Sequence, residues 1–489
     1  MSAGVTLDPI AFWARTRPDA PALVMGEERW SYARLEEAVA EAAVSLFEQG
    51  LVSGEHISVE FGAEDGLHFA TTLHALHRAH LLPVPISQKL TEPERVALRQ
   101  RAHVDFALTA IPEPSASRTG SRVSSARKPA AFERRLDAPA AICFTSGTEG
   151  QPRAVVLTHG NFLWSALGSA RNLGVLASDL WLSCLPLHHV GGLSVLTRSA
   201  YYGTSVLIHE RFEPDAVNRA IDEEGVTLLS LVPPMLERLL DARSGRPFPD
   251  SLRAALVGGG PSPPALLRRA AESRLRALPT YGMTETTSQV TTLSPREWPD
   301  GLETVGRPLP FVQVEVRGSG GRAAGPGEEG EVFVRGPIVA EAYFDEPGVN
   351  RTVFDRRWFR TGDFGAWDER GRLRLLDRRV DRIVVSGENV APAEVETVLL
   401  GHPAVADACV VAIGAGARGQ EVGAALVLRP GADVTLEELR LFAGRSLAPY
   451  KLPRRIHITG ILPRNDAAKL LRGEIRSWFA EEMAEKDRA

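Results

Sequence analysis

The feature that most constrains the fold is a regular alternation of short apolar runs with amphipathic segments. Between residues 204 and 257 the runs SVLIHE, TLLSLVP and AALV are separated by two helix-like segments, and the last run ends in three glycines. Short apolar runs that alternate with helices indicate a largely parallel sheet covered by helices. The chain is therefore predicted to have an α/β fold. We expect helices at 32–49, 67–81, 214–224 and 234–241, and further strands at 56–61 and 82–86.

The pattern changes near residue 312. Short strands with turn clusters follow, as in VQVEVRGSGG and GEVFVRGP, and these are typical of antiparallel hairpins. The remainder, beyond about residue 379, is long enough for a separate domain and predicts helices at 392–400 and 436–445. We therefore expect a large domain, residues 1–378, and a small α+β domain, residues 379–489.

Composition excludes several classes of protein. Hydrophobic residues make up 44% and charged residues 24% of the 489 residues, which is ordinary for a soluble globular chain. The net charge of −5 argues against a nucleic-acid-binding protein. Three widely spaced cysteines favour neither a disulfide framework nor a zinc ribbon. Without a signal-like start or a long apolar run, we expect a cytoplasmic protein with no stable membrane insertion.

One local segment has the composition of a phosphate-binding loop. Residues 144–153, FTSGTEGQPR, follow the apolar run AAIC and combine hydroxyls, glycines and a cation. Small residues let backbone N–H groups approach a phosphate, and a cation offsets its charge. The segment lacks the GxxxxGK[ST] pattern of common nucleotide triphosphatases. An ordinary Gly/Ser/Thr turn is the alternative that this segment leaves open.

Three further motifs follow in order along the chain. Thr284 and Glu285, within YGMTET, offer a hydroxyl and a carboxylate suited to phosphate and Mg²⁺, although Thr284 as a helix cap explains them equally well. Asp363 lies within WFRTGD. A single carboxylate in such a segment is usually just a turn residue. Lys469, within PRNDAAKLLR, is one of only five lysines among 56 basic residues. The alternative to a functional role is an ordinary solvent-exposed lysine.

Together, in this order, the four motifs resemble the adenylate-forming superfamily of acyl- and aryl-CoA synthetases and adenylation domains. The resemblance extends from about residue 10 to residue 480. It implies ATP, Mg²⁺ and coenzyme A as reactants and cofactors, a β-barrel-like subdomain within the large domain, and a mobile small domain. Departures from the family pattern are Glu149 in place of Thr and Arg153-Ala154 in place of Lys-Gly, with charge kept at residue 153.

The resemblance also implies a role for each matching residue. Thr284 would contact the α-phosphate, Glu285 would hold Mg²⁺, and Asp363 would accept the ribose hydroxyls, with Arg378 beside it. Lys469 would offset the repulsion between the attacking carboxylate and the α-phosphate. The remaining nucleotide-binding residues would be Thr145, Ser146, Gly147, Thr148, Gly150, Arg153, Gly258, Gly259, Gly260 and Tyr281.

In this superfamily the small domain rotates about a hinge before the thioester forms. The hinge corresponds to residues 378–382. After rotation Ser386, Gly387 and Glu388 would line the tunnel for the pantetheine arm of coenzyme A. Ser386 departs from the family pattern, in which a second glycine usually stands.

The acyl pocket is expected around LPLHHVGGL, residues 185–193. No Asp that could hold a substrate amine is present there, and His189 matches the residue that gates the carboxylate. Gly259 and Gly282 would approach the acyl group. Several segments, among them YGMTETTSQVTTLSP and LPRNDAAKLLR, are most similar to o-succinylbenzoate–CoA ligases of menaquinone synthesis. That substrate has a second carboxylate, for which we nominate Arg198, with a surface arginine as the alternative.

Other interpretations stay open. The chain would otherwise be a CoA ligase for another aryl or medium-chain acid, a stand-alone adenylation protein that loads a carrier protein, or a scaffold that has lost its activity. A homodimer is left open. His68, His74, His77 and His80 resemble a metal-binding stripe, but a packing helix is the favoured interpretation.

Overall fold

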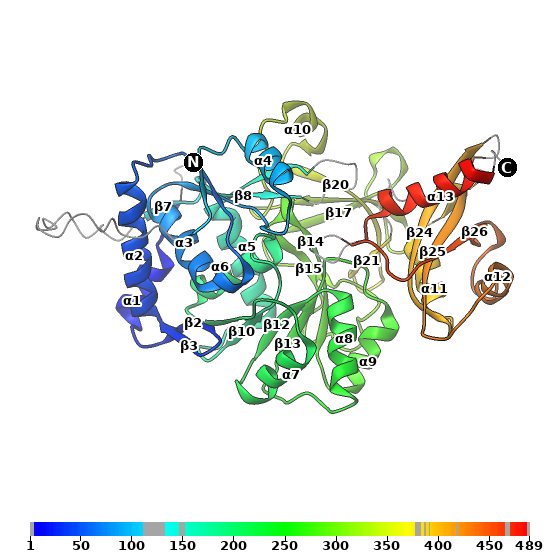
Figure 1. Cartoon of the computed structure of the whole chain (residues 1–489), viewed down its shortest axis with the longest axis horizontal. Helices are drawn as coiled ribbons and strands as arrows, with labels where there is room; N and C mark the ends of the chain where they lie inside the picture. The colour runs from blue at the N-terminus through cyan, green and yellow to red at the C-terminus, as the bar shows by residue number, and fades with distance from the viewer. Residues whose placement is uncertain are drawn as a thin grey trace, which may run out of the picture. The chain divides into compact units, whose positions relative to one another are not determined.

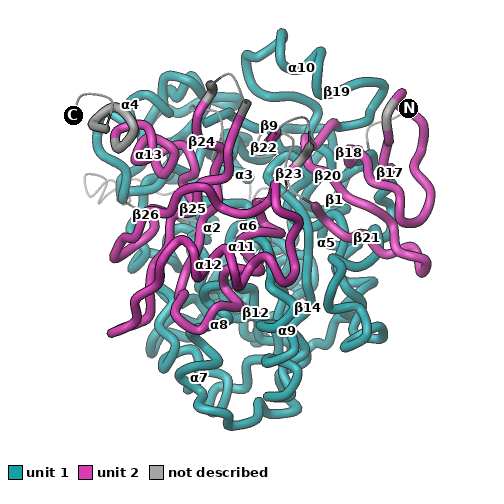
Figure 2. The backbone as a smooth tube through the Cα atoms, turned by 90° about the vertical axis from the view of Figure 1, so that its right-hand side faces the viewer, with its two compact units in different colours: residues 1–145, 152–313, 334–359 teal, residues 146–151, 314–333, 360–489 magenta. Residues whose placement is uncertain are grey.

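The computed structural model describes residues 4–110, 133–145, 152–376, 383–385, 388–390, 392–416, 419–464 and 470–486. The described residues fall into two compact units (Figure 2). Unit 1 comprises residues 1–145, 152–313 and 334–359, and unit 2 contains residues 314–333 and 360–489. The predicted domain boundary at 378/379 stays a prediction, because residues 377–382 lie outside the described residues. Residues 111–131, IPEPSASRTGSRVSSARKPAA, are rich in Ser, Pro and Arg and are expected from the sequence to form a surface linker, and they also lie outside the described residues.

The largest sheet of unit 1 confirms the α/β prediction. Among the described residues it has nine strands in the order β16-β15-β14-β13-β12-β10-β11-β2-β3. The pairs from β14 through to β2 are all parallel, and the outer strands β15, β16 and β3 pair antiparallel. The strands are β2 (Pro21–Met25), β3 (Glu28–Ser31), β10 (Leu180–Ser183), β11 (Ser205–Ile208), β12 (Leu228–Leu231), β13 (Ala254–Val257), β14 (Ala277–Met283), β15 (Ser288–Thr292) and β16 (Arg307–Pro308).

Both faces of this sheet are buried, which explains the continuous apolar runs in the sequence. Alternate residues of a strand point to opposite faces. Leu228 and Ala254 accordingly belong to one hydrophobic core, and their neighbours Leu229 and Ala255 belong to a second. Figure 1 shows α7, α8 and α9 on one side of the sheet and α5 and α6 on the other. The helices are α2 (Tyr32–Glu48), α3 (Gly66–Arg78), α5 (His159–Leu173), α6 (Val190–Tyr202), α7 (Pro214–Glu223), α8 (Pro233–Arg243) and α9 (Pro264–Glu272).

Smaller sheets complete unit 1. The predicted strands near 56–61 and 82–86 are confirmed as β4 and β5, which pair in parallel, with β6 on the other edge of β4. A separate antiparallel pair, β8 and β9, flanks residues 145–153. Their bounds, with those of the remaining elements, are β1 (Val5–Leu7), α1 (Pro9–Thr16), β4 (His56–Val59), β5 (Leu82–Pro85), α4 (Glu92–Arg101), β6 (Phe106–Leu108), β7 (Glu133–Arg135), β8 (Pro139–Phe144), β9 (Ala154–Thr158) and α10 (Pro347–Val353).

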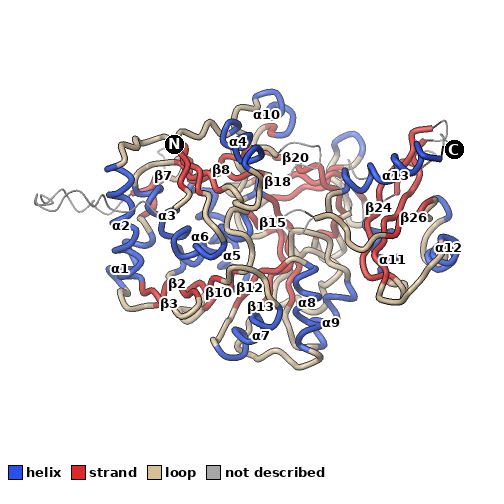
Figure 3. Tube along the Cα trace, in the orientation of Figure 1, coloured by secondary structure: helices blue, strands red, loops and turns tan. Residues whose placement is uncertain are grey.

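The predicted change near residue 312, from alternating strands and helices to short antiparallel strands, is also confirmed. Residues 313–375 supply a five-stranded sheet in which β20 pairs antiparallel with β21. The described residues of 383–458 supply another five-stranded sheet, in which β24 and β25 form a long antiparallel pair. Figure 3 labels β18 and β20 of the first sheet and β24 and β26 of the second. The predicted helix at 392–400 is α11. The elements are β17 (Gln313–Arg317), β18 (Glu329–Arg335), β19 (Phe354–Asp355), β20 (Trp358–Trp367), β21 (Leu373–Leu375), β22 (Ile383–Val385), β23 (Glu388–Val390), α11 (Pro392–Leu400), β24 (Val405–Gly416), β25 (Gly419–Leu428), α12 (Leu436–Ala443), β26 (Arg455–Ile458) and α13 (Arg472–Lys486).

No helix within the described ranges is both long and apolar enough to cross a lipid bilayer.

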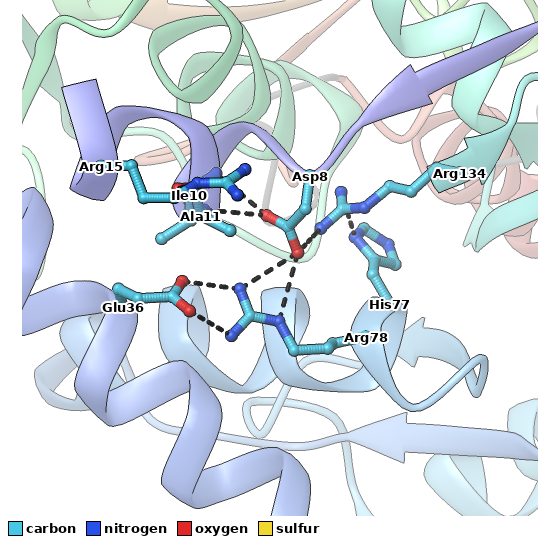
Figure 4. Close-up of polar contacts among 8 residues, drawn as sticks. All are labelled: Asp8, Ile10, Ala11, Arg15, Glu36, His77, Arg78 and Arg134. Carbon is cyan, nitrogen blue, oxygen red and sulfur yellow. Dashed lines mark hydrogen bonds and ion pairs between the residues drawn. The ribbon is translucent and has the colours of Figure 1, made fainter. Parts of the chain in front are cut away.

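A buried network of charges joins the first helices of unit 1 (Figure 4). Asp8 caps α1 by accepting hydrogen bonds from the N–H groups of Ile10 and Ala11. Its other oxygen, Oδ2, accepts from Arg78 Nη2 at 3.1 Å and lies 3.0 Å from Arg134 Nη2. Arg78 also donates two hydrogen bonds to Glu36 on α2. Burial opposes ionisation of Asp8, but Arg134 and Arg78 outweigh it and hold the pKa of the carboxyl well below its ordinary value.

Histidines of α3 extend this network into the core, as the packing-helix interpretation predicts. His74 and His77 are buried, and His77 Nε2 lies 2.7 Å from the carbonyl oxygen of Ala140. The His77 ring also contacts that of His159, with ring centroids 4.8 Å apart. Burial, followed by the charge of Arg134, lowers the pKa of both His74 and His159 to about 3. Within the described residues no group of three or more potential ligands is arranged to hold a metal ion.

Unit 1 should therefore lose stability in mild acid. Below pH 6.5 the unfolded chain binds protons on His74 and His159, which the folded chain does not bind until about pH 3. The expected loss is about 2 kcal/mol per histidine between pH 6.5 and 5. Chemical denaturation at pH 7 and pH 5 should show a smaller loss for His74→Leu than for the parent chain. His68→Gln changes a partly exposed histidine of the same helix and serves as control; equal losses in all three proteins would contradict the account.

Candidate active site

Parallel pairing brings several candidate residues to one edge of the large sheet. Strands β10, β12, β13 and β14 run in the same direction, so their carboxyl ends lie together. After β10 the chain enters residues 184–189, after β13 it enters Gly258–Gly260, and after β14 it enters Thr284–Thr286. Ligands of open α/β sheets bind in the crevice outside the carboxyl ends of the strands. Three predicted motifs thus lie where this fold class places its binding sites.

The first two of the three glycines after β13 are required by their surroundings. A Cβ on Gly258 would lie 2.7 Å from the Thr280 side chain on β14. Gly259 has φ +79°, a conformation that residues with a side chain rarely adopt. A Cβ on Gly260 would meet only the Pro233 side chain, at an ordinary contact distance of 4.0 Å. The loop therefore presents backbone at this edge, as expected of a segment that a nucleotide or acyl group approaches closely.

A tight turn positions Glu285 at the end of β14. The register of β14 against β15 shifts between Tyr281 and Gly282, and a Cβ on Gly282 would overlap the carbonyl oxygen of Ser288. The 3₁₀ turn Thr284–Thr286 follows, with the Thr286 hydroxyl accepting a hydrogen bond from the Met283 N–H at 3.1 Å. Thr284 is the first residue of this turn, so the alternative in which it caps a helix does not describe the structure.

The Glu285 carboxylate is held by a residue that sequence reasoning missed. The Tyr343 hydroxyl donates a hydrogen bond to Glu285 Oε1 at 2.7 Å. The Ala340 N–H donates to the Glu285 carbonyl oxygen at 2.8 Å. Burial, followed by the charge of Glu285, raises the pKa of Tyr343, so the phenol stays protonated. Glu285 and Tyr343 are 58 residues apart, and no local pattern in the sequence connects them.

The two ends of the candidate phosphate loop are bonded to each other. The Thr145 N–H donates to the Arg153 carbonyl oxygen at 2.9 Å, and the Arg153 N–H donates to the Thr145 hydroxyl at 3.2 Å. Arg101 Nη1 donates to the Pro152 carbonyl oxygen at 3.0 Å. The Arg153 guanidinium lies 5.5 Å from the ring centroid of Tyr343. The predicted residues Ser146, Gly147, Thr148 and Gly150 lie outside the described residues.

His189 stands at the start of α6, as the residue preceding its first turn. Its N–H donates to the Pro186 carbonyl oxygen at 3.1 Å, and its ring centroid lies 4.3 Å from that of His188. Burial, then His189 and Lys89, lower the pKa of His188 to about 3. His188 is therefore neutral at physiological pH, and the pair follows directly from the carboxyl end of β10.

Arg198, two turns further along α6, is buried rather than exposed. Only 2% of its surface is accessible, so the surface-arginine alternative is wrong. Its Nη2 lies 3.4 Å from the Ser165 hydroxyl, its guanidinium lies 5.9 Å from the Trp181 ring centroid, and its Nε has no hydrogen-bond partner. Burial lowers its pKa to about 10, which leaves it charged at neutral pH. Within the described residues no carboxylate forms an ion pair with it.

The other predicted residues are in unit 2 or outside the described residues. Asp363, on β20, is 7% exposed, and its N–H donates to the Thr361 hydroxyl at 3.0 Å. Thr361 in turn donates to the Val332 carbonyl oxygen at 2.8 Å. Glu388 opens strand β23. Arg378, Ser386, Gly387 and Lys469 lie outside the described residues.

Comparison with known proteins agrees with this arrangement. Residues 10–344 match the family described as AMP-binding enzyme, and residues 394–469 match the AMP-binding enzyme C-terminal domain. The chain is 38% identical to the 2-succinylbenzoate–CoA ligase of Bacillus cereus strain Q1, over 95% of this chain and 97% of that protein.

Solved structures show the same fold. The o-succinylbenzoate CoA synthetase (MenE) of Bacillus subtilis in complex with the acyl-adenylate intermediate OSB-AMP is similar with a TM-score of 0.87 and 34% identity, covering 97% of this chain and 98% of that one. The amide bond synthetase McbA of Marinactinospora thermotolerans has a TM-score of 0.85 and 26% identity, covering 96% and 99%. From the family match, the full-length similarity and the motifs at the sheet edge, we conclude that this chain belongs to the AMP-binding enzyme family.

Proposed function

We propose that the chain is an ATP-dependent 2-succinylbenzoate–CoA ligase of menaquinone biosynthesis. In the first half-reaction a carboxylate oxygen of the acid attacks the α-phosphorus of ATP, and pyrophosphate leaves. In the second, the thiol of coenzyme A attacks the acyl carbonyl of the adenylate, and AMP leaves. Support comes from relatives of this activity that match almost the whole chain.

The observation that carries the choice of acid is the buried charge of Arg198, with which no carboxylate among the described residues is paired. The proposed substrate has an aliphatic carboxylate to be activated and an aryl carboxylate to be bound unchanged. A buried cation without a counter-ion is unfavourable until an anion reaches it. Arg198, on the helix that begins after His189, supplies such a cation at 2% exposure. It would bind the aryl carboxylate while His189 lies beside the carboxylate that reacts.

The residues at the sheet edge suit a magnesium nucleotide. Carboxylate oxygens are ligands that Mg²⁺ prefers, and it commonly binds through one or two carboxylates together with substrate phosphates. The hydrogen bond from Tyr343 engages one oxygen of Glu285, so the carboxylate is fixed while the second oxygen remains for a metal. When bound, Mg²⁺ would neutralise phosphate charge. Thr284 would hydrogen-bond the α-phosphate, and Gly258, Gly259 and Gly260 would admit the nucleotide close to the backbone.

Three roles rest on the family resemblance alone. Asp363, with Arg378, would bind the ribose hydroxyls. Lys469, in the mobile domain predicted for residues 379–489, would bridge the reacting carboxylate and the α-phosphate as charge shifts between them. The predicted tunnel residues Ser386, Gly387 and Glu388 would serve only the second half-reaction.

The overall activity is tested by supplying the purified chain with ATP, Mg²⁺ and o-succinylbenzoate. Acid-dependent release of pyrophosphate is expected without coenzyme A, and its addition should yield o-succinylbenzoyl-CoA, identified by mass spectrometry. A panel of other aryl and medium-chain acids provides the comparison. Faster thioester formation from another acid would change the proposed substrate, and absence of pyrophosphate release with every acid would remove the ligase proposal.

The role of Arg198 is tested by Arg198→Ala. Loss of the cation should weaken use of o-succinylbenzoate by about 2–5 kcal/mol in kcat/KM, the usual cost of leaving a buried charge unpaired. An analogue without the aryl carboxylate should lose far less. Arg243 is similarly buried but is already paired with Asp222 at 2.8 Å, so Arg243→Ala should affect both acids equally. Equal losses for both acids in Arg198→Ala would assign that residue to the fold.

The division between half-reactions is tested by Lys469→Ala in single-turnover experiments. Adenylation should slow by about 10²–10³-fold, the scale for losing one preorganised charge-stabilising group. With preformed acyl-adenylate, transfer to coenzyme A should proceed near the normal rate. A bulky replacement of Gly387 should give the reverse pattern. If Lys469→Ala slows both half-reactions alike, domain rotation does not operate in this protein.

A further inference from the structure

We propose that Tyr343 is a positioning residue for Glu285 and that it couples this carboxylate to Arg153 at the end of the phosphate loop. The proposal rests on the proposed function, because it concerns how that enzyme prepares its magnesium nucleotide site. Its basis is a chain of contacts within unit 1. The Tyr343 hydroxyl donates to Glu285 Oε1 at 2.7 Å, and the face of its ring lies 5.5 Å from the Arg153 guanidinium.

The backbone of Tyr343 is fixed independently of these two contacts. Its N–H donates to Asn350 Oδ1, and its carbonyl oxygen accepts from Asn350 Nδ2, both at 2.8 Å. Tyr343 also forms an isolated antiparallel bridge with Val155 on β9, the strand that begins just after Arg153. The ring packs against Phe354, and only 4% of the residue is exposed. The hydroxyl is therefore presented from a rigid anchor rather than from a mobile loop.

A rigid donor has a definite effect on a carboxylate ligand. Glu285 is half-buried and has several side-chain rotamers available in isolation. A hydrogen bond to one carboxylate oxygen selects a rotamer and leaves the other oxygen for a cation. Tyrosine suits this position because its hydroxyl reaches Glu285 Oε1 from a buried ring whose backbone is held by Asn350. Phenylalanine would keep the ring packing and remove the hydrogen bonds that the phenol makes with Glu285 and Arg153.

The second contact in the proposed coupling is the one between Tyr343 and Arg153. Its guanidinium lies near the ring face of Tyr343, and its Nε lies 3.5 Å from Glu346 Oε2. Arg101, which donates to the Pro152 carbonyl oxygen, also lies 3.9 Å from Glu346 Oε1. A planar cation interacts with an aromatic face in a way that a compact ammonium matches less well. Tyr343 thus contacts the last residue of the phosphate loop with its ring and its hydroxyl, and it contacts the expected metal ligand with the same hydroxyl.

The test compares Tyr343→Phe with Tyr32→Phe. Tyr32 is a matched control, because its hydroxyl is also buried and bonds the carbonyl oxygens of Thr204 at 2.9 Å and Ser199 at 3.2 Å, neither of which is an expected magnesium or nucleotide residue. ATP binding is measured by calorimetry over a titration of Mg²⁺ without any acid. Tyr343→Phe should raise the Mg²⁺ concentration for half-maximal ATP binding by about 10-fold or more, the range for removing a group that orients a metal ligand. Tyr32→Phe should leave it at the wild-type value.

Coupling to Arg153 is measured by a double-mutant cycle in the same assay. Arg153→Lys keeps the charge and removes the planar group, and its effect on the Mg²⁺ requirement should combine non-additively with that of Tyr343→Phe. Additive effects would mean that Tyr343 acts on Glu285 alone, and they would overturn the proposed coupling to Arg153. An unchanged Mg²⁺ requirement in Tyr343→Phe, or equal shifts in both Tyr→Phe variants, would overturn the positioning role.

Because this readout needs no acid, it separates the two proposals. Normal Mg²⁺-dependent ATP binding without acid-dependent pyrophosphate release would refute the ligase proposal and leave the Tyr343 comparison valid. ATP binding that does not depend on Mg²⁺ in the wild-type chain would refute the positioning proposal directly.

Discussion

Parallel pairing of β10, β12, β13 and β14 is the constraint on which the candidate site depends. Parallel hydrogen bonding fixes the direction of each strand, and the direction determines which loops share an edge. The His189 segment, the glycines from Gly258 and the Glu285 turn are separated by up to about one hundred residues of sequence, yet each begins where one of these strands ends. The helices on both faces bury the sheet and thereby hold this edge in place.

Two groups of buried charges in unit 1 differ in whether a counter-charge is paired with them. Around Asp8, two arginines face two carboxylates, so the charges are paired and the network joins α1, α2 and α3. Arg198 is buried to a similar degree, but no carboxylate is paired with it within the described residues. Removing one member of a buried ion pair leaves the other charge buried without a partner, which is unfavourable. A buried charge that has no partner in the protein gains one when a ligand of opposite charge binds. The first arrangement serves the fold, and the second is the arrangement expected of a binding site.

Sequence reasoning predicted the elements well because their signals are local. Apolar runs and flanking glycines located β11, β12 and β13, and helix 392–400 has the predicted bounds. The motifs at Thr145, Glu285 and Asp363 were proposed for the same reason, and the roles of these residues stay predictions. Burial of Arg198 could not be read from the sequence, since its position on α6 alone fits an exposed arginine too. The bond between Tyr343 and Glu285 was missed because it joins residues 58 positions apart that only the fold brings together.

Arginine and lysine carry the same charge on groups of different shape, and the chain uses this difference. The chain uses arginine for nearly all its positive charges, and several sites exploit the planar guanidinium: Arg78 bridges Asp8 and Glu36, and Arg153 lies near the ring of Tyr343. Such contacts need a rigid, flat group with several donors. Charge that shifts between a carboxylate and a phosphate needs a compact and mobile one instead. Against that background, the role proposed for Lys469, a point charge that follows the reaction, is one that suits lysine, whereas the contacts of Arg78 and Arg153 suit arginine.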